Sequence, residues 1–276
     1  MKKYVVLFFL FSCVLSASEL HIIFTANVNG ILEDCRCGNE PLGGLARVKT
    51  FVTEFRQQHP NTLLIDGGDF LNPYTYPDLN NAMSDFMQYL DYDIITAGDQ
   101  EFIEGYDFFQ KHLQRYQKIF LASNCNFGRS IIQRTVNDIP VTVVSFLSPK
   151  CFTFIRKPKQ LVIDSLLTGI SGMPGKGLRI LLYHGETKDI VKRLPQISCI
   201  DLVLSGHVQR LDSWQENGIC FVGGGLDTEV IMIVKATGVS GNWEFEVTSR
   251  EMDASVMEDH DLKSLIGEYK SGRKGN

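Results

Sequence analysis

Residues 20–30 read Leu-His-Ile-Ile-Phe-Thr-Ala-Asn-Val-Asn-Gly, a mainly apolar run that ends in a short polar patch. The same succession returns four more times along the chain, and each run that precedes a patch is typical of a buried strand. The later patches are Asp66-Gly-Gly-Asp69, Gly98-Asp-Gln-Glu101, Tyr183-His-Gly185 and Gly206-His-Val-Gln209. In open α/β sheets, polar groups that gather beyond the carboxyl ends of neighbouring strands form the functional site. The five patches therefore predict an α/β fold with a metal site at one edge of its sheets.

The composition suits one globular domain. The chain has 276 residues, of which 44% are hydrophobic and 21% are charged, and its formal net charge is -5. A chain of this length can bury a substantial core. The acidic balance excludes nucleic acid as a partner on charge grounds.

The first residues predict export. Lys2 and Lys3 precede the apolar run of residues 5–15, and small residues follow at 16–18. This three-part layout is typical of a secretory signal peptide over residues 1–18, which would send the protein to the periplasm or cell envelope. The run is shorter than the roughly 18 to 20 apolar residues that cross a bilayer, which argues against a membrane-spanning segment. The alternative is a lipoprotein signal at Leu10-Phe-Ser-Cys13, in which Cys13 would carry a lipid anchor.

Strands and helices alternate in the first part of the chain. Apolar runs predict strands at 20–24, 62–65 and 93–96, and helical spacing predicts helices at 45–55 and 79–90. Further strands are expected at 119–122, 141–146, 178–183, 201–204, 219–222, 230–234 and 243–247, with helices near 106–116 and 187–194. This order predicts mixed sheets packed together, with helices outside. We expect one domain over residues 19–250 and a charged tail over 251–276 that is helical around 259–269.

The five patches, in this order, resemble the motifs of the calcineurin-like metallophosphoesterases, most closely the metallophosphatase domain of the periplasmic 5′-nucleotidase and UDP-sugar hydrolase family. The resemblance covers residues 20–247. It implies the metallo-dependent phosphatase fold, a four-layer αββα sandwich of two mixed sheets. That family adds a C-terminal domain that grips the nucleobase and sugar, and the residues after Val247 cannot build one. Nucleotide specificity is therefore not expected.

The resemblance also implies a set of metal ligands. Two divalent metals held close together need a bridging carboxylate and further ligands around each ion. Asp69 matches the bridging aspartate, and the second metal would be completed by Asp99, His184 and His207. The family has asparagine at the position of Asp99, and a carboxylate is at least as good a ligand. This donor set suits zinc, manganese or iron.

The first metal position is depleted. The family's aspartate and histidine fall on Asn27 and Asn29, and neutral amide oxygens bind transition metals weakly. Gln209 matches the glutamine that the nucleotidase branch carries in its last motif. Asn27, Asn29 and Gln209 are therefore candidate ligands of a weaker site at this first position.

The third patch carries Gln100 where the family has a histidine that contacts the transferred phosphoryl group. Its amide can donate a hydrogen bond to a phosphate oxygen, so Gln100 is a catalytic candidate together with Asp99. It cannot carry a positive charge or donate a proton as imidazolium would. Loss of such a group costs about two to four orders of magnitude in rate.

Cys35 and Cys37 lie in a loop directly after the first patch. Thiolates are strong ligands for zinc and softer metals, so this pair could rebuild the depleted position. A redox-active pair and a loop disulfide without chemistry are the alternatives, because spacing alone does not identify a metal. Asn124 matches a segment near the substrate side of the nucleotidases, which makes it a candidate for substrate contact. The alternative interpretation is that Asn124 is a turn residue at the end of a strand.

These residues together predict an exported metal-dependent phosphoesterase-like hydrolase that acts on a small phosphorylated or anionic ligand, with metal-bound water as nucleophile. Two alternatives stay open. Asn27, Asn29 and Gln100 favour a pseudoenzyme that binds an anion, a metal or a protein partner in the same cleft. Cys35 and Cys37 would support thiol or sulfur chemistry, by analogy with the exported thiosulfohydrolases of this superfamily.

Overall fold

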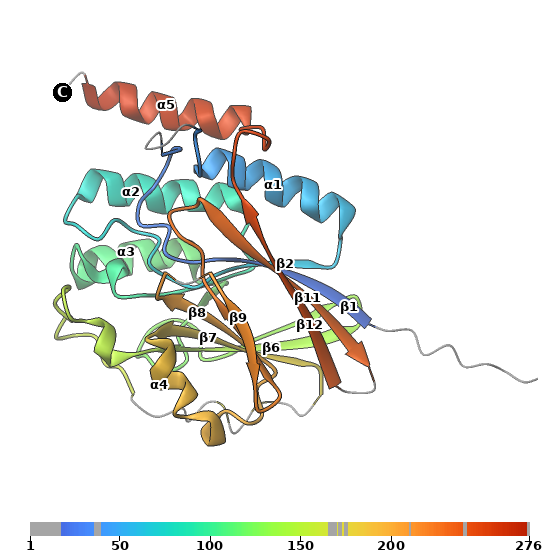
Figure 1. Cartoon of the computed structure of the whole chain (residues 1–276). Helices are drawn as coiled ribbons and strands as arrows, with labels where there is room; N and C mark the ends of the chain where they lie inside the picture. Colours follow the sequence, from blue (N-terminus) through green and yellow to red (C-terminus); the bar gives the residue numbers. More distant parts are fainter. Residues whose placement is uncertain are drawn as a thin grey trace, which may run out of the picture.

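The computed structural model describes residues 18–35, 40–164, 170, 173, 176–209, 211–239 and 242–274. Within these residues, two six-stranded mixed sheets pack face to face, and helices cover both outer faces (Figure 1). The layers run helix, sheet, sheet, helix, so the predicted αββα sandwich is confirmed.

The first sheet has the strand order β12-β11-β1-β2-β3-β4. Strands β1 to β4 run parallel, and β11 and β12 add an antiparallel pair beside β1. The parallel arrangement brings the polar patches that follow β1, β2 and β3 to the same edge. The bounds are β1 Ser18–Thr25, β2 Thr62–Asp66, β3 Ile94–Thr96, β4 Phe120–Leu121, β11 Val230–Val239 and β12 Asn242–Glu251.

The second sheet has the order β5-β6-β7-β8-β10-β9. Its four central strands run parallel, and the edge strands β5 and β9 pair antiparallel. The last two polar patches lie at the carboxyl ends of β7 and β8. The bounds are β5 Ile132–Val136, β6 Ile139–Leu147, β7 Leu178–Gly185, β8 Leu202–His207, β9 Ser213–Glu216 and β10 Ile219–Gly223.

Helices cover the outer faces of both sheets (Figure 1). On the side of the first sheet lie α1 Leu45–Gln58, α2 Pro77–Phe86, α3 Tyr106–Tyr116 and α5 His260–Lys274, with α5 outside α1 and α2, and the second sheet carries α4 Thr187–Val191. Short 3₁₀ turns join these elements: η1 Met87–Leu90, η2 Gln100–Phe102, η3 Pro149–Cys151 and η4 Leu194–Gln196. The turns η2 and η3 both lie next to the polar patches.

Side-chain alternation along the strands separates the core into three apolar layers. On β7, Ile180 and Leu182 point between the two sheets, whereas Leu181 points to the opposite face with the residues of α4. The same alternation directs His184 between the sheets at the carboxyl end of β7, where its exposed fraction is 0%. A polar residue is thus buried at the point where the inter-sheet core ends.

The apolar runs did not predict the two edge strands of the second sheet, β5 and β9. Both form hairpins whose turn residues have positive φ: 46° at Asn137 and 62° at Asp138 before β6, and 51° at Asn217 and 79° at Gly218 before β10. An Asn-Gly pair between strands is the strongest short-range hairpin signal. Asn217-Gly218 could therefore have identified β9. The other predicted strands and helices are present.

The residues treated as a charged tail contribute to the core. Asp259 accepts a hydrogen bond from the N–H of Leu262 and so caps the start of α5. Leu262 and Ile266 are buried in the apolar cluster that also contains residues of α1 and α2. The predicted signal peptide and Cys13 lie outside the described residues, except for Ser18 at the start of β1. No helix in the described ranges is long and apolar enough to cross a membrane.

We expect Ile266→Ala to lower the free energy of unfolding by about 2–5 kcal/mol, because it removes buried methyl groups and leaves a cavity. Ser264→Ala, on the exposed side of the same helix, is the control and should change stability by less than about 0.5 kcal/mol. Urea denaturation of both variants measures the difference. Equal stability of the two variants would mean that α5 is not part of the cooperative core.

Candidate metal centre

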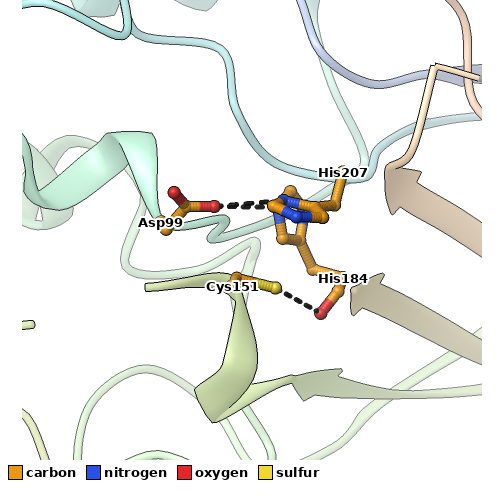
Figure 2. A group of neighbouring side chains, drawn as sticks. All are labelled: Asp99, Cys151, His184 and His207. Carbon is orange, nitrogen blue, oxygen red and sulfur yellow. Dashed lines mark hydrogen bonds and ion pairs between the residues drawn. The ribbon is translucent and has the colours of Figure 1, made fainter. Parts of the chain in front are cut away.

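Four predicted ligands converge where the two sheets meet. Asp69 follows β2, Asp99 follows β3, and His184 and His207 come from the ends of β7 and β8. His184 Nε2 lies 3.3 Å from Asp69 Oδ2 and 3.6 Å from Asp99 Oδ1. His207 Nδ1 lies 3.2 Å from Asp99 Oδ1 and 3.9 Å from Asp69 Oδ2. Figure 2 shows the two imidazoles beside the Asp99 carboxylate.

The backbone is left-handed at several motif positions. The φ angle is 61° at Asp69, 72° at His207 and 55° at both Asn27 and Asn29. Positive φ is uncommon for residues other than glycine and persists only where the surrounding structure fixes it. Such conformations cluster at functional sites, so this strain is independent support for a site here.

A backbone carbonyl orients His184. Its Nδ1 donates a hydrogen bond to the carbonyl oxygen of Gly67 at 2.8 Å, which leaves the lone pair of Nε2 directed into the site. Burial acts to lower the pKa of His184. The carboxylates of Asp69 and Asp99 outweigh burial and raise that pKa well above its usual value. The site therefore attracts positive charge strongly.

The same attraction acts on the neighbouring groups. Contact with Asp99, and then with Cys151, raises the pKa of His207 to about 10. Burial acts to raise the pKa of Asp99, but the two histidines lower it to about 2. The raised pKa of His207 indicates a negative potential that a bound cation would also satisfy, and the lowered pKa of Asp99 keeps its carboxylate charged.

The residues present fit a divalent metal. Asp99 Oδ1, His184 Nε2 and His207 Nδ1 are buried and have no hydrogen-bond partner among the described residues. Buried polar atoms are nearly always paired, because an orphan costs about 1–3 kcal/mol. A Cβ added to Gly98 would lie 2.1 Å from Asp69 Oδ1 and 2.5 Å from His184 Nε2, so the backbone here leaves no room for a side chain. Two imidazoles and two carboxylates form a donor set for zinc, manganese or iron.

Cys151 is a member of the cluster that sequence reasoning missed. Its Sγ and the ligand atoms of Asp99, His184 and His207 all lie within 4.8 Å of one another. It closes η3, just beyond the carboxyl end of β6, and its side chain is buried. No motif surrounds it, so only its place after a central strand could have indicated it.

Glu101 was also missed, and it fixes the backbone around Asp69. Its buried carboxylate accepts the N–H groups of Gly98 at 2.6 Å, Asp69 at 2.9 Å, Phe70 at 2.9 Å and Leu71 at 3.2 Å. Burial, and then the charge of Asp69, raise the pKa of Glu101 to about 8, while the backbone N–H groups act in the opposite direction. One side chain thus joins the loop after β2 to the loop after β3. The acidic residue that ends the third patch was the available signal.

Asn27 and Asn29 use their amides within the protein. Asn27 Oδ1 accepts the N–H of His207 at 2.9 Å, and its Nδ2 donates to the carbonyl oxygen of Gly225 at 3.1 Å. Asn29 Nδ2 donates to Asp227 Oδ1 at 2.6 Å, and its Oδ1 accepts from Gln100 at 3.0 Å. The geometry therefore favours a loop-bracing role for both residues over the predicted metal ligation.

The two predicted glutamines differ in position. Gln100 begins η2 beside the site, and its Oε1 is buried with no partner in the described part of the chain. Gln209 follows β8 and is exposed, and it makes no hydrogen bond to another described residue. The structure thus brings Gln100, but not Gln209, into the network around the site.

Two further predictions concern the loops. Cys35 is disulfide-bonded and is not a free thiolate, so in this state it cannot supply the predicted metal ligand. Cys37 lies outside the described residues. Asn124 is buried, and its Nδ2 donates to the carbonyl oxygens of Leu147 and Asp164, both at 2.9 Å. Its Oδ1 accepts the N–H of Leu147 at 2.9 Å, so this side chain braces the end of β6 rather than facing a substrate.

No protein-family model matches the chain. The chain is 37% identical to the trifunctional nucleotide phosphoesterase protein YfkN of Bacillus subtilis over 211 residues, which cover 59% of this chain and 14% of YfkN. It is 31% identical to the 5′-nucleotidase of Bos taurus over 217 residues, which cover 68% of this chain and 38% of that protein. The chain therefore spans less than half the length of either relative.

Solved structures share the fold. A 5′-nucleotidase precursor from Thermus thermophilus has a TM-score of 0.83 at 16% identity, covering 94% of this chain and 59% of that one. A sulfate thiohydrolase, SoxB, from the same organism has a TM-score of 0.81 at 14% identity, covering 93% and 61%. The calcineurin-like phosphoesterase YfkN from Bacillus subtilis has a TM-score of 0.75 at 18% identity, covering 93% and 98%. At these identities the likeness establishes the fold alone.

We expect Glu101→Ala to lower the free energy of unfolding by about 3 kcal/mol or more, because four buried N–H groups lose their acceptor. Glu54→Ala, on the exposed face of α1, is the matched control and should be nearly neutral. Denaturant titration compares the two. If Glu101→Ala is as stable as the control, the carboxylate does not hold the two loops together.

Proposed function

Because the chain belongs to the calcineurin-like metallophosphoesterase superfamily, with a domain of the 5′-nucleotidase type, we propose that it is an exported metal-dependent hydrolase of a small phosphoester. The observation that carries the proposal is the set of three buried ligand atoms without hydrogen-bond partners in the described structure, on Asp99, His184 and His207. A purely structural role would not require these side chains to face one another in a negative potential.

We assign the metal to Asp69, Asp99, His184 and His207, with zinc, manganese or iron as the ion. When bound, the metal would act as a Lewis acid toward a phosphoryl oxygen and lower the pKa of an attacking water. The chain prepares this geometry itself. A backbone carbonyl holds the His184 ring, and Glu101 fixes the backbone on which Asp69 stands.

Gln100 is the candidate for contact with the phosphoryl group. One hydrogen of its Nε2 is used by Asn29, which leaves the second available to a phosphate oxygen. A neutral amide supplies neither the charge of an imidazolium nor a proton for the leaving group. The proposed activity is therefore slow compared with an enzyme that has histidine at this position.

A non-catalytic binding protein is the second candidate. The observation that favours it is the chain of hydrogen bonds from Asp227 through Asn29 to Gln100, in which neutral amides occupy positions that are charged in the family pattern. Such a protein would bind a metal or an anion in the same place without turnover. We do not extend the proposal to thiol chemistry at Cys35, because Cys35 is disulfide-bonded.

Export is proposed on the signal-like layout of residues 1–18, with a lipid anchor at Cys13 as the alternative. The disulfide-bonded state of Cys35 supports it, because disulfides persist in oxidising compartments such as the periplasm. The proposed substrate is a small phosphorylated or anionic molecule, since the nucleotide activities named for the relatives belong to much longer proteins.

Metal content tests the proposal directly. The purified protein should contain about one equivalent of divalent metal by elemental mass spectrometry, and His184→Ala should lose it, because its Nε2 is central to the cluster. His260→Ala, at an exposed histidine, is the control and should keep the metal. Phosphoester turnover with added zinc or manganese is measured in parallel. Metal without turnover would leave the binding protein, and absence of both would overturn the metal centre.

Restoring the family residue at position 100 should raise activity. We expect Gln100→His to increase phosphomonoester turnover by about 10²-fold or more, because imidazolium can both stabilise charge and donate a proton. Gln57→His, on the exposed face of α1, makes the same substitution away from the site and should leave the rate unchanged. The two rates are compared on a chromogenic phosphomonoester at equal metal loading. No gain over the control would argue that Gln100 does not face the reacting group.

A further inference from the structure

Cys151 is a buried free thiol beside the proposed metal ligands. Its exposed fraction is 2%. Its Sγ and the ligand atoms of Asp99, His184 and His207 all lie within 4.8 Å of one another. Figure 2 shows the sulfur below the two imidazoles, next to the backbone carbonyl oxygen of His184. Among the described cysteines, the other three free thiols lie outside this group: Cys125, Cys199 and Cys220.

The fold places Cys151 there through contacts to His184. The N–H of Ser148 donates to the carbonyl oxygen of His184 at 2.9 Å, and the N–H of Cys151 donates to the carbonyl oxygen of Ser148 at 3.1 Å. The thiol of Cys151 also donates to the carbonyl oxygen of His184 at 3.4 Å. Asn124 makes two hydrogen bonds to the backbone of Leu147, which lies two residues before this turn. The turn η3 therefore holds its sulfur next to the imidazole rather than in an apolar pocket.

The second observation that points to a ligand is the unpartnered nitrogen of His184. Its side chain is 1% exposed, and its Nε2 is buried with no hydrogen-bond partner among the described residues. Asp99 Oδ1 and His207 Nδ1 also have no hydrogen-bond partner in the described structure, although they lie 3.2 Å apart as an ion pair. One oxygen, two nitrogens and the sulfur thus lie close enough together to contact one cation.

We propose that Cys151 binds the metal as a thiolate and, with Asp99, His184 and His207, forms a four-ligand site that selects zinc over manganese and magnesium. The proposal rests on the metal centre proposed above and adds to it a ligand and a preference. As the sulfur–metal bond forms, the thiol gives up its hydrogen bond to His184 and releases its proton to solvent. Thiolate and imidazole suit zinc, whereas manganese and magnesium prefer oxygen ligands.

The assignment changes the role of Asp69. The other four side chains would supply the usual number of protein ligands of a zinc site. Asp69 Oδ2 lies beside His184 Nε2 at 3.3 Å and becomes the carboxylate that borders the coordination sphere. A substrate oxygen would then enter by expanding that sphere or by displacing a ligand.

Cobalt(II) is the probe for the sulfur ligand. The wild-type protein loaded with Co²⁺ should show the intense near-ultraviolet charge-transfer absorption of a thiolate–cobalt bond, and Cys151→Ser should lose it. Cys199→Ser is the matched control, because the Cys199 thiol also donates to a backbone carbonyl, that of Ile170, at 3.5 Å. The control should keep the absorption. Its persistence in Cys151→Ser, or its loss in Cys199→Ser, would overturn the assignment.

Competition between Zn²⁺ and Mn²⁺ measures the preference. We expect Cys151→Ser to lower the ratio of zinc affinity to manganese affinity by roughly tenfold or more. Substitutions of residues that support metal ligands typically lower metal affinity by about 10- to 100-fold. Cys199→Ser should leave the ratio unchanged. An unchanged ratio in Cys151→Ser would show that the sulfur does not select the metal.

X-ray absorption at the zinc edge needs no substitution and so does not depend on a variant folding. Sulfur as a ligand predicts a scatterer at about 2.3 Å from zinc in the wild-type protein. Bound zinc with nitrogen and oxygen neighbours only would overturn the cysteine assignment and leave the metal centre standing. A protein that binds neither Zn²⁺ nor Co²⁺ would overturn both.

Discussion

The hydrogen bond from His184 Nδ1 to the carbonyl oxygen of Gly67 joins the two sheets at the point where the site forms. It can exist only because the backbones approach closely there. A Cβ on Gly206 would lie 2.5 Å from the same carbonyl oxygen, and a Cβ on Gly68 would lie 2.4 Å from the backbone nitrogen of Gly98. The glycines in the motifs therefore let ligands from two separate sheets reach one another. The inter-sheet core behind them fixes the distance.

Much of this arrangement could be predicted from residue order. Five polar patches after apolar runs locate the carboxyl edge of both sheets, and four of the side chains named from them, Asp69, Asp99, His184 and His207, do converge. Cys151 and Glu101 were missed for different reasons. The position of Cys151 depends on a turn anchored to the carbonyl oxygen of a residue 33 positions away, and no local pattern encodes that contact. The role of Glu101 depends on the backbone N–H groups that it binds. Because every residue except proline has such a group, the sequence does not show which ones a side chain will bind.

The two asparagines show why residue identity alone could not settle the ligand set. Asn27 and Asn29 were candidate ligands because they occupy ligand positions of the first motif. In the structure, Asn27 accepts the N–H of His207 and Asn29 connects Asp227 to Gln100. An amide carries a donor and an acceptor on one planar group, so it can bridge a donor and an acceptor partner, which an ionised carboxylate, with acceptors only, cannot do. Compared with the family's aspartate and histidine, Asn27 and Asn29 thus lack a charged or metal-binding group but form hydrogen bonds between loops. The backbone at both positions is left-handed.

Charge decides how many metals such a site can hold. Asp69 and Asp99 supply two negative charges, which balance one divalent cation in buried surroundings. A second divalent cation would leave two positive charges uncompensated, since the amides of Asn27 and Asn29 are neutral and uncompensated buried charge is costly. A thiolate from Cys151 would take the total for one metal to one negative charge. A site with one net negative charge repels a dianionic phosphomonoester more strongly than a monoanionic phosphodiester, because the repulsion grows with the charge on the substrate. The same cluster that holds the cation therefore also limits the substrate, and phosphodiesters suit the proposed thiolate site better than phosphomonoesters do.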